Sequence, residues 1–185
     1  MLEGEYKIIR RAKNGSANDF GLLYDHYIAQ IYRFVLLKVS HKQEAEDLSH
    51  EIFLSAWKNI ERYYDRGLPF SSWLYQIARN KIIDYYRVKK EAVAIDNVSE
   101  NEFAIKNVLN EDLDHNSAIK KVKSYFQYLS EEQQNVIILR FIEDLSPAEI
   151  ANAINKSEGA VRIIQHRAIK QLKKVFDQEQ NGDLI

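Results

Sequence analysis

The chain has 185 residues, which is enough for one medium domain or two small ones. It contains no cysteine, which excludes disulfides and thiolate metal sites. The formal net charge of −1 argues against a uniformly basic, nucleic-acid-binding surface. The charge is unevenly distributed, however, because residues 79–90 and 156–174 are rich in lysine and arginine while residues 91–114 are acidic. Two basic segments therefore flank an acidic one.

Most of the chain has the three- or four-residue apolar spacing of a helix, so we predict an all-α fold. The first clear helix begins after Ser16. The next helix follows a capping box that starts at Ser40, and this helix runs to about Ile60. Residues 65–69 contain glycine and proline and predict a loop. A further helix is predicted over residues 71–89.

Helical periodicity is lost after this helix and returns near Ile119. Ser130 and Ser146 each begin a capping box, the second with proline at the first helical position. Ser157 is expected to cap a last helix that continues to about Phe176.

This pattern predicts two small helical domains, at residues 1–90 and 117–176. Residues 91–116 are expected to form a flexible acidic linker, and residues 177–185 a frayed tail. The chain has no apolar run long enough to span a membrane and no secretory signal at its start, so we expect a cytoplasmic protein without membrane insertion.

Residues 145–174 predict a helix–turn–helix, with Asn155 at the turn because asparagine tolerates the left-handed conformation. In the second helix, apolar residues share one face and basic residues the other. Such a helix can pack by one side and enter a DNA major groove by the other. The alternative is an amphipathic helix with a solvated basic face. Ile163 lies on the basic side of the wheel, where core packing does not explain it.

Residues 62–65 combine aromatic and charged side chains directly before the basic helix 71–89. This composition suits single-stranded DNA, on whose unpaired bases aromatic rings can stack. The alternative is that the nearby aromatic residues belong to the core, and we assign Trp73 there.

A stripe of Asp47, His50, Glu51 and Leu54 is predicted on the helix that ends near Ile60, opposite its apolar face. Carboxylates on a helix surface often serve only solubility. An apolar residue ringed by charges, such as Leu54, can also anchor a protein partner.

These motifs, in this order, resemble the extracytoplasmic-function (ECF) sigma factors of bacterial RNA polymerase, in the sigma-70 family. Residues 44–57 and 70–87 resemble region 2 of that family, and residues 129–141, 145–151 and 157–168 resemble region 4. The resemblance covers nearly the whole chain except the linker and the tail.

The resemblance implies that region 2 docks on the β′ clamp helices of core polymerase and opens the inner promoter element. It implies that region 4 binds the outer element as duplex DNA and touches the β flap. An anti-sigma factor is an expected partner, whereas no metal, cofactor or enzymatic activity is expected. The residues that would contact polymerase are Asp47, His50, Glu51 and Leu54. Those that would contact the inner element are Arg62, Tyr64, Asp65, Gln76, Asn80, Lys81, Asp84 and Arg87. Those that would contact the outer element are Ser157, Glu158, Arg162, Ile163, His166, Arg167 and Lys170.

Three features depart from the family pattern. His50 stands where the family usually has glutamine, and Asn155 where the turn usually has glycine. Ile163 and Ile164 replace a pair that is often polar. Three rival functions also remain open: a helix–turn–helix repressor or activator with a sensing domain, a nucleic-acid enzyme using Mg²⁺, and a degenerate sigma homologue that only titrates regulators.

Overall fold

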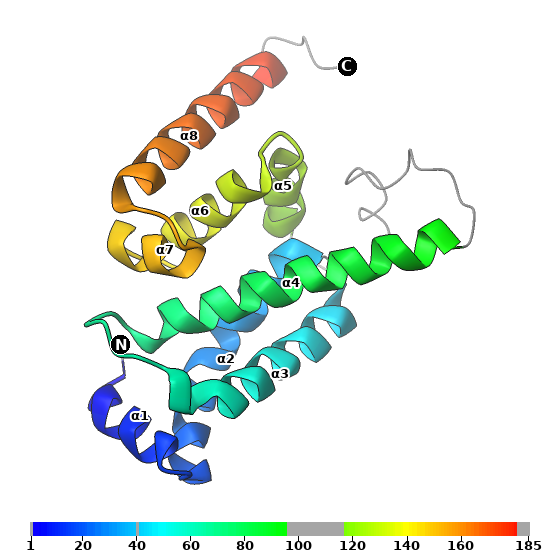
Figure 1. The fold of residues 1–185 in the computed structure, drawn as a ribbon. Helices are drawn as coiled ribbons and strands as arrows, with labels where there is room; N and C mark the ends of the chain where they lie inside the picture. Colours follow the sequence, from blue (N-terminus) through cyan, green and yellow to red (C-terminus); the bar gives the residue numbers. More distant parts are fainter. Residues whose placement is uncertain (1, 40, 96–116, 181–185) are drawn as a thin grey trace. The chain divides into compact units, whose positions relative to one another are not determined.

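The computed structural model describes residues 2–39, 41–95 and 117–180, and all regular secondary structure in these segments is helical. The chain divides into two compact units, Met1–Asp112 and Leu113–Ile185 (Figure 1). This confirms the predicted all-α, two-unit fold class. None of the described helices is long and apolar enough to cross a membrane.

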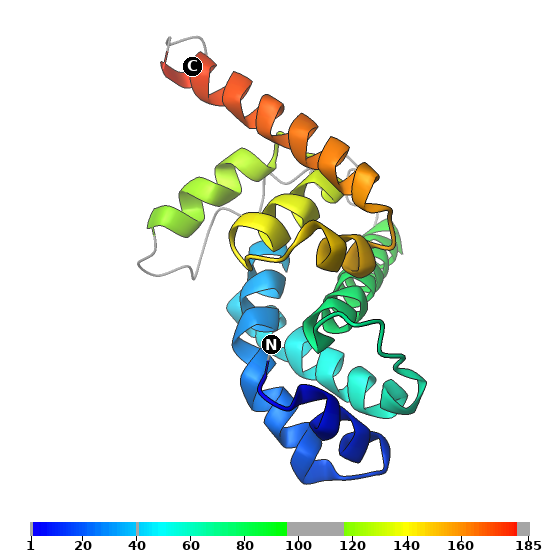
Figure 2. The same ribbon diagram turned by 90° about the vertical axis from the view of Figure 1, so that its left-hand side faces the viewer.

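The first unit is a bundle in which α2 contacts three other helices and α3 also packs on α4 (Figures 1 and 2). Its elements are α1 (Glu5–Lys13), α2 (Ala17–Val39), α3 (Lys42–Asn59), the 3-10 turn η1 (Ile60–Arg62) and α4 (Phe70–Ile95). Large side chains from α2, α3 and α4 fill the centre: Leu23, Tyr27, Ile31, Phe34, Ile52, Phe70, Leu74 and Tyr75. All of them are almost fully buried, so packing of one apolar face per helix holds this unit together.

The sequence prediction missed α1, although Ile8, Ile9 and Ala12 are spaced for one helical face and are buried. The capping box predicted at Ser40 is wrong, because His41 occupies the N-cap position of α3 without a side-chain hydrogen bond. With the helix starting one residue later, Gln43 does not reach the third helical position that a capping box requires. Ser40 itself lies outside the described residues.

Helix α4 continues to Ile95, six residues beyond the predicted end at Lys89. The added sequence, KEAVAI, contains glutamate and alanine, which favour helix even where the acidic segment was expected to begin. The rest of the predicted linker, residues 96–116, lies outside the described residues.

The second unit contains α5 (Ser117–Phe126), α6 (Glu131–Phe141), α7 (Pro147–Ile154) and α8 (Glu158–Gln180). Helices α6 and α7 pack on each other and on α8. The capping boxes at Ser130 and Ser146 are confirmed. The Ser157 hydroxyl accepts the N–H of Ala160 at 3.2 Å and caps the last helix. Asn155 adopts the left-handed conformation, with φ 55°, at the turn between α7 and α8.

Helix α8 reaches Gln180, so the predicted tail is wrong for residues 177–180, which are helical. Lysine, glutamine and glutamate near this end favour continuation of the helix. Residues 181–185 lie outside the described residues.

Candidate protein- and nucleic-acid-binding surfaces

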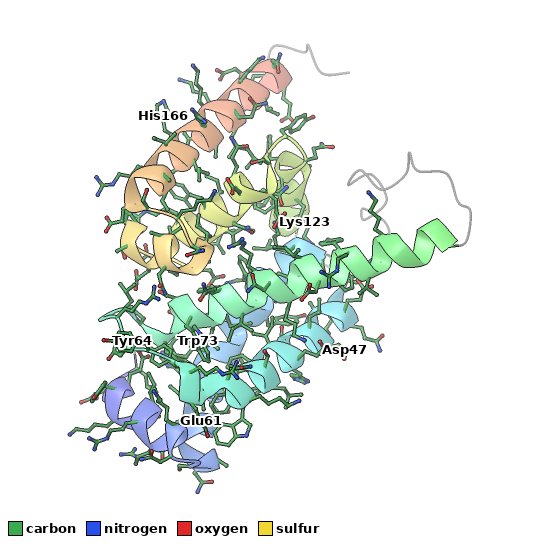
Figure 3. All side chains as sticks on the ribbon, in the orientation of Figure 1. Asp47, Glu61, Tyr64, Trp73, Lys123 and His166 are labelled. Atoms are coloured by element: carbon green, nitrogen blue, oxygen red, sulfur yellow. The ribbon has the colours of Figure 1, made fainter. Side chains whose placement is uncertain are left out.

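The predicted stripe on α3 is exposed along its length, and Figure 3 labels Asp47 on this helix. The side chains of Asp47, His50, Glu51 and Leu54 all face solvent, and Leu54 is 58% exposed. The opposite face of α3 is buried through residues such as Ala45 and Ile52. An exposed leucine among charged side chains has the composition of a protein-docking site.

The α3 stripe and helix α4 are joined by an ion pair. Lys81 Nζ on α4 lies 3.1 Å from Glu51 Oε2 on α3. Such a partly exposed pair contributes about 1 kcal/mol or less, so Lys81 can exchange this carboxylate for a phosphate at small cost. The structure therefore brings a residue assigned to polymerase next to a residue assigned to DNA.

The loop between η1 and α4 presents one tyrosine and buries its neighbour. Tyr64 is 79% exposed, whereas Tyr63 is 6% exposed. The ring of Tyr63 packs edge-on against Phe70 and Trp73, with 5.2 Å between ring centroids in each case. Burial, with the nearby charges of Asp65 and Glu5, raises the pKa of Tyr63 to about 12. The assignment of Trp73 to the core is only partly right, because its ring packs against Tyr63 and Phe70 but its side chain is half-buried.

The tip of the same loop is a tight turn. Gly67 has φ +71°, a conformation that side-chain-bearing residues rarely adopt. Its N–H donates to Asp65 Oδ1 at 2.8 Å. Asp65, which was predicted to contact the inner element, therefore also has a local role, because one of its carboxylate oxygens shapes the turn that follows Tyr64.

The polar side chains assigned to the inner element lie mostly in solvent. Arg62 on η1 and Asn80 on α4 are exposed, and Gln76 is half-buried. Arg87 is exposed and pairs with Asp84 at 3.1 Å, one helical turn away. Together with Tyr64, these residues give unit one an exposed aromatic ring beside a polar and basic helix.

Two residues that hold the loop were missed in the sequence. Lys13 Nζ donates to the carbonyl oxygen of Tyr63 at 2.8 Å, and Glu5 accepts the N–H of Phe70 at 3.0 Å. Glu5 is 5% exposed and also accepts the hydroxyl hydrogen of Tyr27. The apolar spacing in α1 could have revealed the helix, but no local signal marks contacts to residues so distant in the chain.

Helix α8 presents the predicted basic face to solvent, and His166 is labelled on this helix in Figure 3. Exposed side chains along it are Ser157, Glu158, Arg162, Ile163, His166, Arg167 and Lys170. Val161, Ala168 and Val175 are buried on the other side, and Ile163 is 54% exposed. The outward position of Ile163 is therefore confirmed. Arg162 lies 3.6 Å from Glu158, a weak pair on the helix surface.

Within the described segments, histidine, aspartate and glutamate never gather in threes with the geometry to hold a metal ion. Among the carboxylates noted above, Asp65 shapes a turn, Glu51 pairs with Lys81, and Glu5 accepts the N–H of Phe70.

Comparisons with known proteins match both units. The family model for Sigma-70 region 2 matches residues 23–91, and that for Sigma-70, region 4 matches residues 125–174. The ECF RNA polymerase sigma factor BldN of Streptomyces coelicolor is 32% identical over 175 residues, covering 92% of this chain and 65% of that protein. The ECF RNA polymerase sigma factor SigW of Bacillus subtilis is 30% identical over 177 residues, covering 91% of this chain and 94% of that protein.

Solved structures are similar in fold. The sigma factor RpoE of Bartonella quintana, in complex with the anti-sigma factor NepR, has a TM-score of 0.69 and 22% identity, covering 87% of this chain and 98% of that chain. A region 2 unit followed by a region 4 helix–turn–helix unit defines a transcription initiation factor of the sigma-70 type. The chain belongs to the ECF RNA polymerase sigma factors.

Proposed function

We propose that this sigma factor divides promoter recognition between its two units as follows. Residues 1–90 dock on the β′ clamp helices of core polymerase and open the inner promoter element. Residues 117–176 bind the outer element as duplex DNA and touch the β flap. Residues 91–116 link the two activities.

The observation that carries the proposal for unit one is the exposure of Tyr64, at 79%, beside a neighbour that is buried. Stacking of a base on an aromatic side chain contributes about 1–3 kcal/mol, and it requires an accessible ring on a defined backbone. Arg62, Asp65, Asn80 and Arg87 supply hydrogen-bonding groups for the edges of an unpaired base and for its phosphate. Gln76, Lys81 and Asp84 extend this surface along α4.

The α3 stripe supplies the polymerase contact in this proposal. Leu54 is its apolar anchor, and Asp47, His50 and Glu51 form the charged and polar rim. Truncation of a central anchor of this type costs about 2 kcal/mol or more, whereas individual rim charges contribute little. His50 places an imidazole where the family usually has a glutamine.

The exposed face of α8 supplies the outer-element contact. Arg162, His166, Arg167 and Lys170 bond to guanine edges or phosphates, and Ser157 and Glu158 lie at the start of the helix. Ile163 is exposed between these side chains, and the apolar feature that a major groove offers it is the thymine methyl group. The competing role for Ile163 is packing against the β flap.

We further propose that an anti-sigma factor holds this chain inactive, as the RpoE structure contains an anti-sigma factor bound to its sigma factor. The protein acts without metal, cofactor or catalytic step of its own, as a dissociable polymerase subunit. Its site of action is the cytoplasm, where its polymerase and promoters are.

Run-off transcription with core polymerase on genomic fragments tests the overall function. We expect specific transcripts only when the protein is added. Absence of added transcripts, together with DNA binding by the protein alone, would instead identify a repressor.

Permanganate reactivity of promoter thymines then tests the role of Tyr64. Tyr64→Ala should slow strand opening while closed-complex binding stays close to wild type. Tyr6→Ala is the matched control, because Tyr6 is another exposed tyrosine of the same unit, at 61% exposure. Unchanged strand opening in Tyr64→Ala would refute single-strand recognition by this loop.

A further inference from the structure

Helix α1 holds both ends of the loop that presents Tyr64. The helix spans Glu5–Lys13, and the match to Sigma-70 region 2 begins only at residue 23. The role of α1 is therefore not assigned by the family match, and it must be derived from its contacts.

The first contact fixes the peptide unit directly before the ring of Tyr64. Lys13 Nζ donates to the carbonyl oxygen of Tyr63 at 2.8 Å, and that carbonyl belongs to the peptide bond joining Tyr63 to Tyr64. Because the peptide unit is planar, a hydrogen bond to its oxygen restrains the plane from which the Tyr64 backbone continues. The Tyr63 ring is meanwhile locked against Phe70 and Trp73. The backbone directly before Tyr64 is thus tied to a lysine on α1.

The second contact lies at the other end of the loop. Glu5 Oε2 accepts the N–H of Phe70, the first residue of α4, at 3.0 Å. Glu5 is buried, and its other oxygen accepts from Tyr27 on α2, so this end is tied to the core of the bundle. Between these anchors, the side chains of Tyr64, Asp65 and Arg66 are exposed.

We infer that α1 is a positioning element for promoter opening and that Lys13 is its positioning residue, acting through Tyr64 rather than touching DNA. This inference rests on the proposed reading of unpaired DNA by Tyr64. Its physical basis is preorganisation: a ring already held in its binding direction loses less conformational freedom when a base stacks on it. A free loop would have to order its backbone at that moment.

A competing role for Lys13 is simple attraction of phosphate by a positive charge on α1. Arg10 supplies a matched control, because it is an exposed cation on the same helix, and Arg10→Met removes one positive charge without removing the Lys13 bond. Lys13→Met removes the same charge and also releases the Tyr63 carbonyl. Lys13→Arg keeps both the charge and a donor that can reach a carbonyl.

The experiment uses holoenzyme assembled from core polymerase and each full-length variant, on a promoter recovered by the run-off assay. Closed-complex affinity and the strand-opening rate constant are measured separately, the latter from the time course of thymine permanganate reactivity. We expect Lys13→Met to slow opening about five-fold, the equivalent of ordering roughly one side chain, with closed-complex affinity at the Arg10→Met value. Lys13→Arg should restore most of the rate.

A double-mutant cycle with Tyr64→Ala separates the possible outcomes. If Lys13 acts through Tyr64, Lys13→Met should change the opening rate little once Tyr64→Ala is present. An equal slowing in both backgrounds, or an effect no larger than that of Arg10→Met, overturns the inference while leaving single-strand reading by Tyr64 intact. If Tyr64→Ala alone opens DNA at the wild-type rate, the proposed function of the loop fails, and the inference fails with it. Urea unfolding of each variant identifies any that lose rate by losing the fold.

Discussion

The buried carboxylate of Glu5 should be a main source of stability for the first unit, and Glu5→Ala tests this. Glu5 is 5% exposed and accepts hydrogen bonds from the Tyr27 hydroxyl and from the Phe70 N–H. Its removal leaves both donors in a buried site without this acceptor, at about 1–1.5 kcal/mol each. We therefore expect Glu5→Ala to lower the free energy of unfolding by about 2–3 kcal/mol.

The chain offers a selective assay for this unit. Its two tryptophans, Trp57 and Trp73, both lie in the first unit, so tryptophan fluorescence during urea unfolding reports that unit alone. With a urea dependence of about 1–3 kcal/mol per molar, the midpoint should fall by about 0.7–3 M. Glu3→Ala is the matched control, because Glu3 is exposed and lies two residues away.

A double-mutant cycle identifies the contact responsible. Tyr27→Phe removes the hydroxyl that donates a hydrogen bond to Glu5. This substitution should lower the free energy of unfolding much less in the Glu5→Ala background than in wild type. Equal midpoints for Glu5→Ala and Glu3→Ala, or full additivity with Tyr27→Phe, would refute the reasoning. In that case the Glu5 carboxylate would contribute little to holding α1 in the unit.

Three further outcomes are expected. Leu54→Asp should weaken binding to core polymerase by more than ten-fold (about 2 kcal/mol) without unfolding the unit. Leu22→Asp, at a comparably exposed leucine on α2, should leave this binding unchanged. A pull-down that retains both variants equally would contradict the docking surface. Replacing a thymine of the outer element with uracil should weaken binding by about 1 kcal/mol for wild type but not for Ile163→Ala, and equal affinities at every position would favour a flap contact instead. Because the pKa of Tyr63 rises from 10.0 to about 12, the unfolded chain ionises first, so stability is lost as the pH rises from 10 to 12. That loss of stability should be smaller by about 2 kcal/mol in Tyr63→Phe, as measured from urea midpoints at each pH. An identical pH dependence in both proteins would show that burial does not raise the pKa of the Tyr63 phenol.

Features that depend only on residues a few positions apart could be predicted from the sequence. The capping boxes at Ser130 and Ser146 join residues three apart, and both form as the sequence indicates. The outward position of Ile163 follows from helical periodicity alone, since its buried neighbours fall on the other side of the same wheel. The turn at Asn155 likewise depends on one residue's tolerance of positive φ.

Features that depend on tertiary contacts were not predictable in this way. Glu5 is bonded to a residue 65 positions away, and Lys13 to one 50 positions away. Neither residue type signals burial or a loop contact, because glutamate and lysine are usually solvated. The N-cap at His41 instead of Ser40 shows the same limit, since Glu44 in the first turn of α3 is bound by Lys89 of α4. The ion pair between Glu44 and Lys89 joins two helices, so the sequence around the start of α3 does not reveal it.

Three of the cations assigned to DNA are paired with a carboxylate, which bears on when they can act. Lys81 pairs with Glu51, Arg87 with Asp84, and Arg162 with Glu158. Each pair is partly exposed and weak, so in the proposed DNA complex each would be exchanged for a phosphate at small cost. With a net charge of −1, the free chain has little general attraction for DNA to offset those exchanges. Docking of polymerase on the α3 stripe would engage Glu51, so that Lys81 would lose its ion-pair partner and could bind a phosphate instead. The same contact that recruits the enzyme would then raise the affinity of α4 for DNA, which favours promoter binding by the holoenzyme over binding by the free subunit.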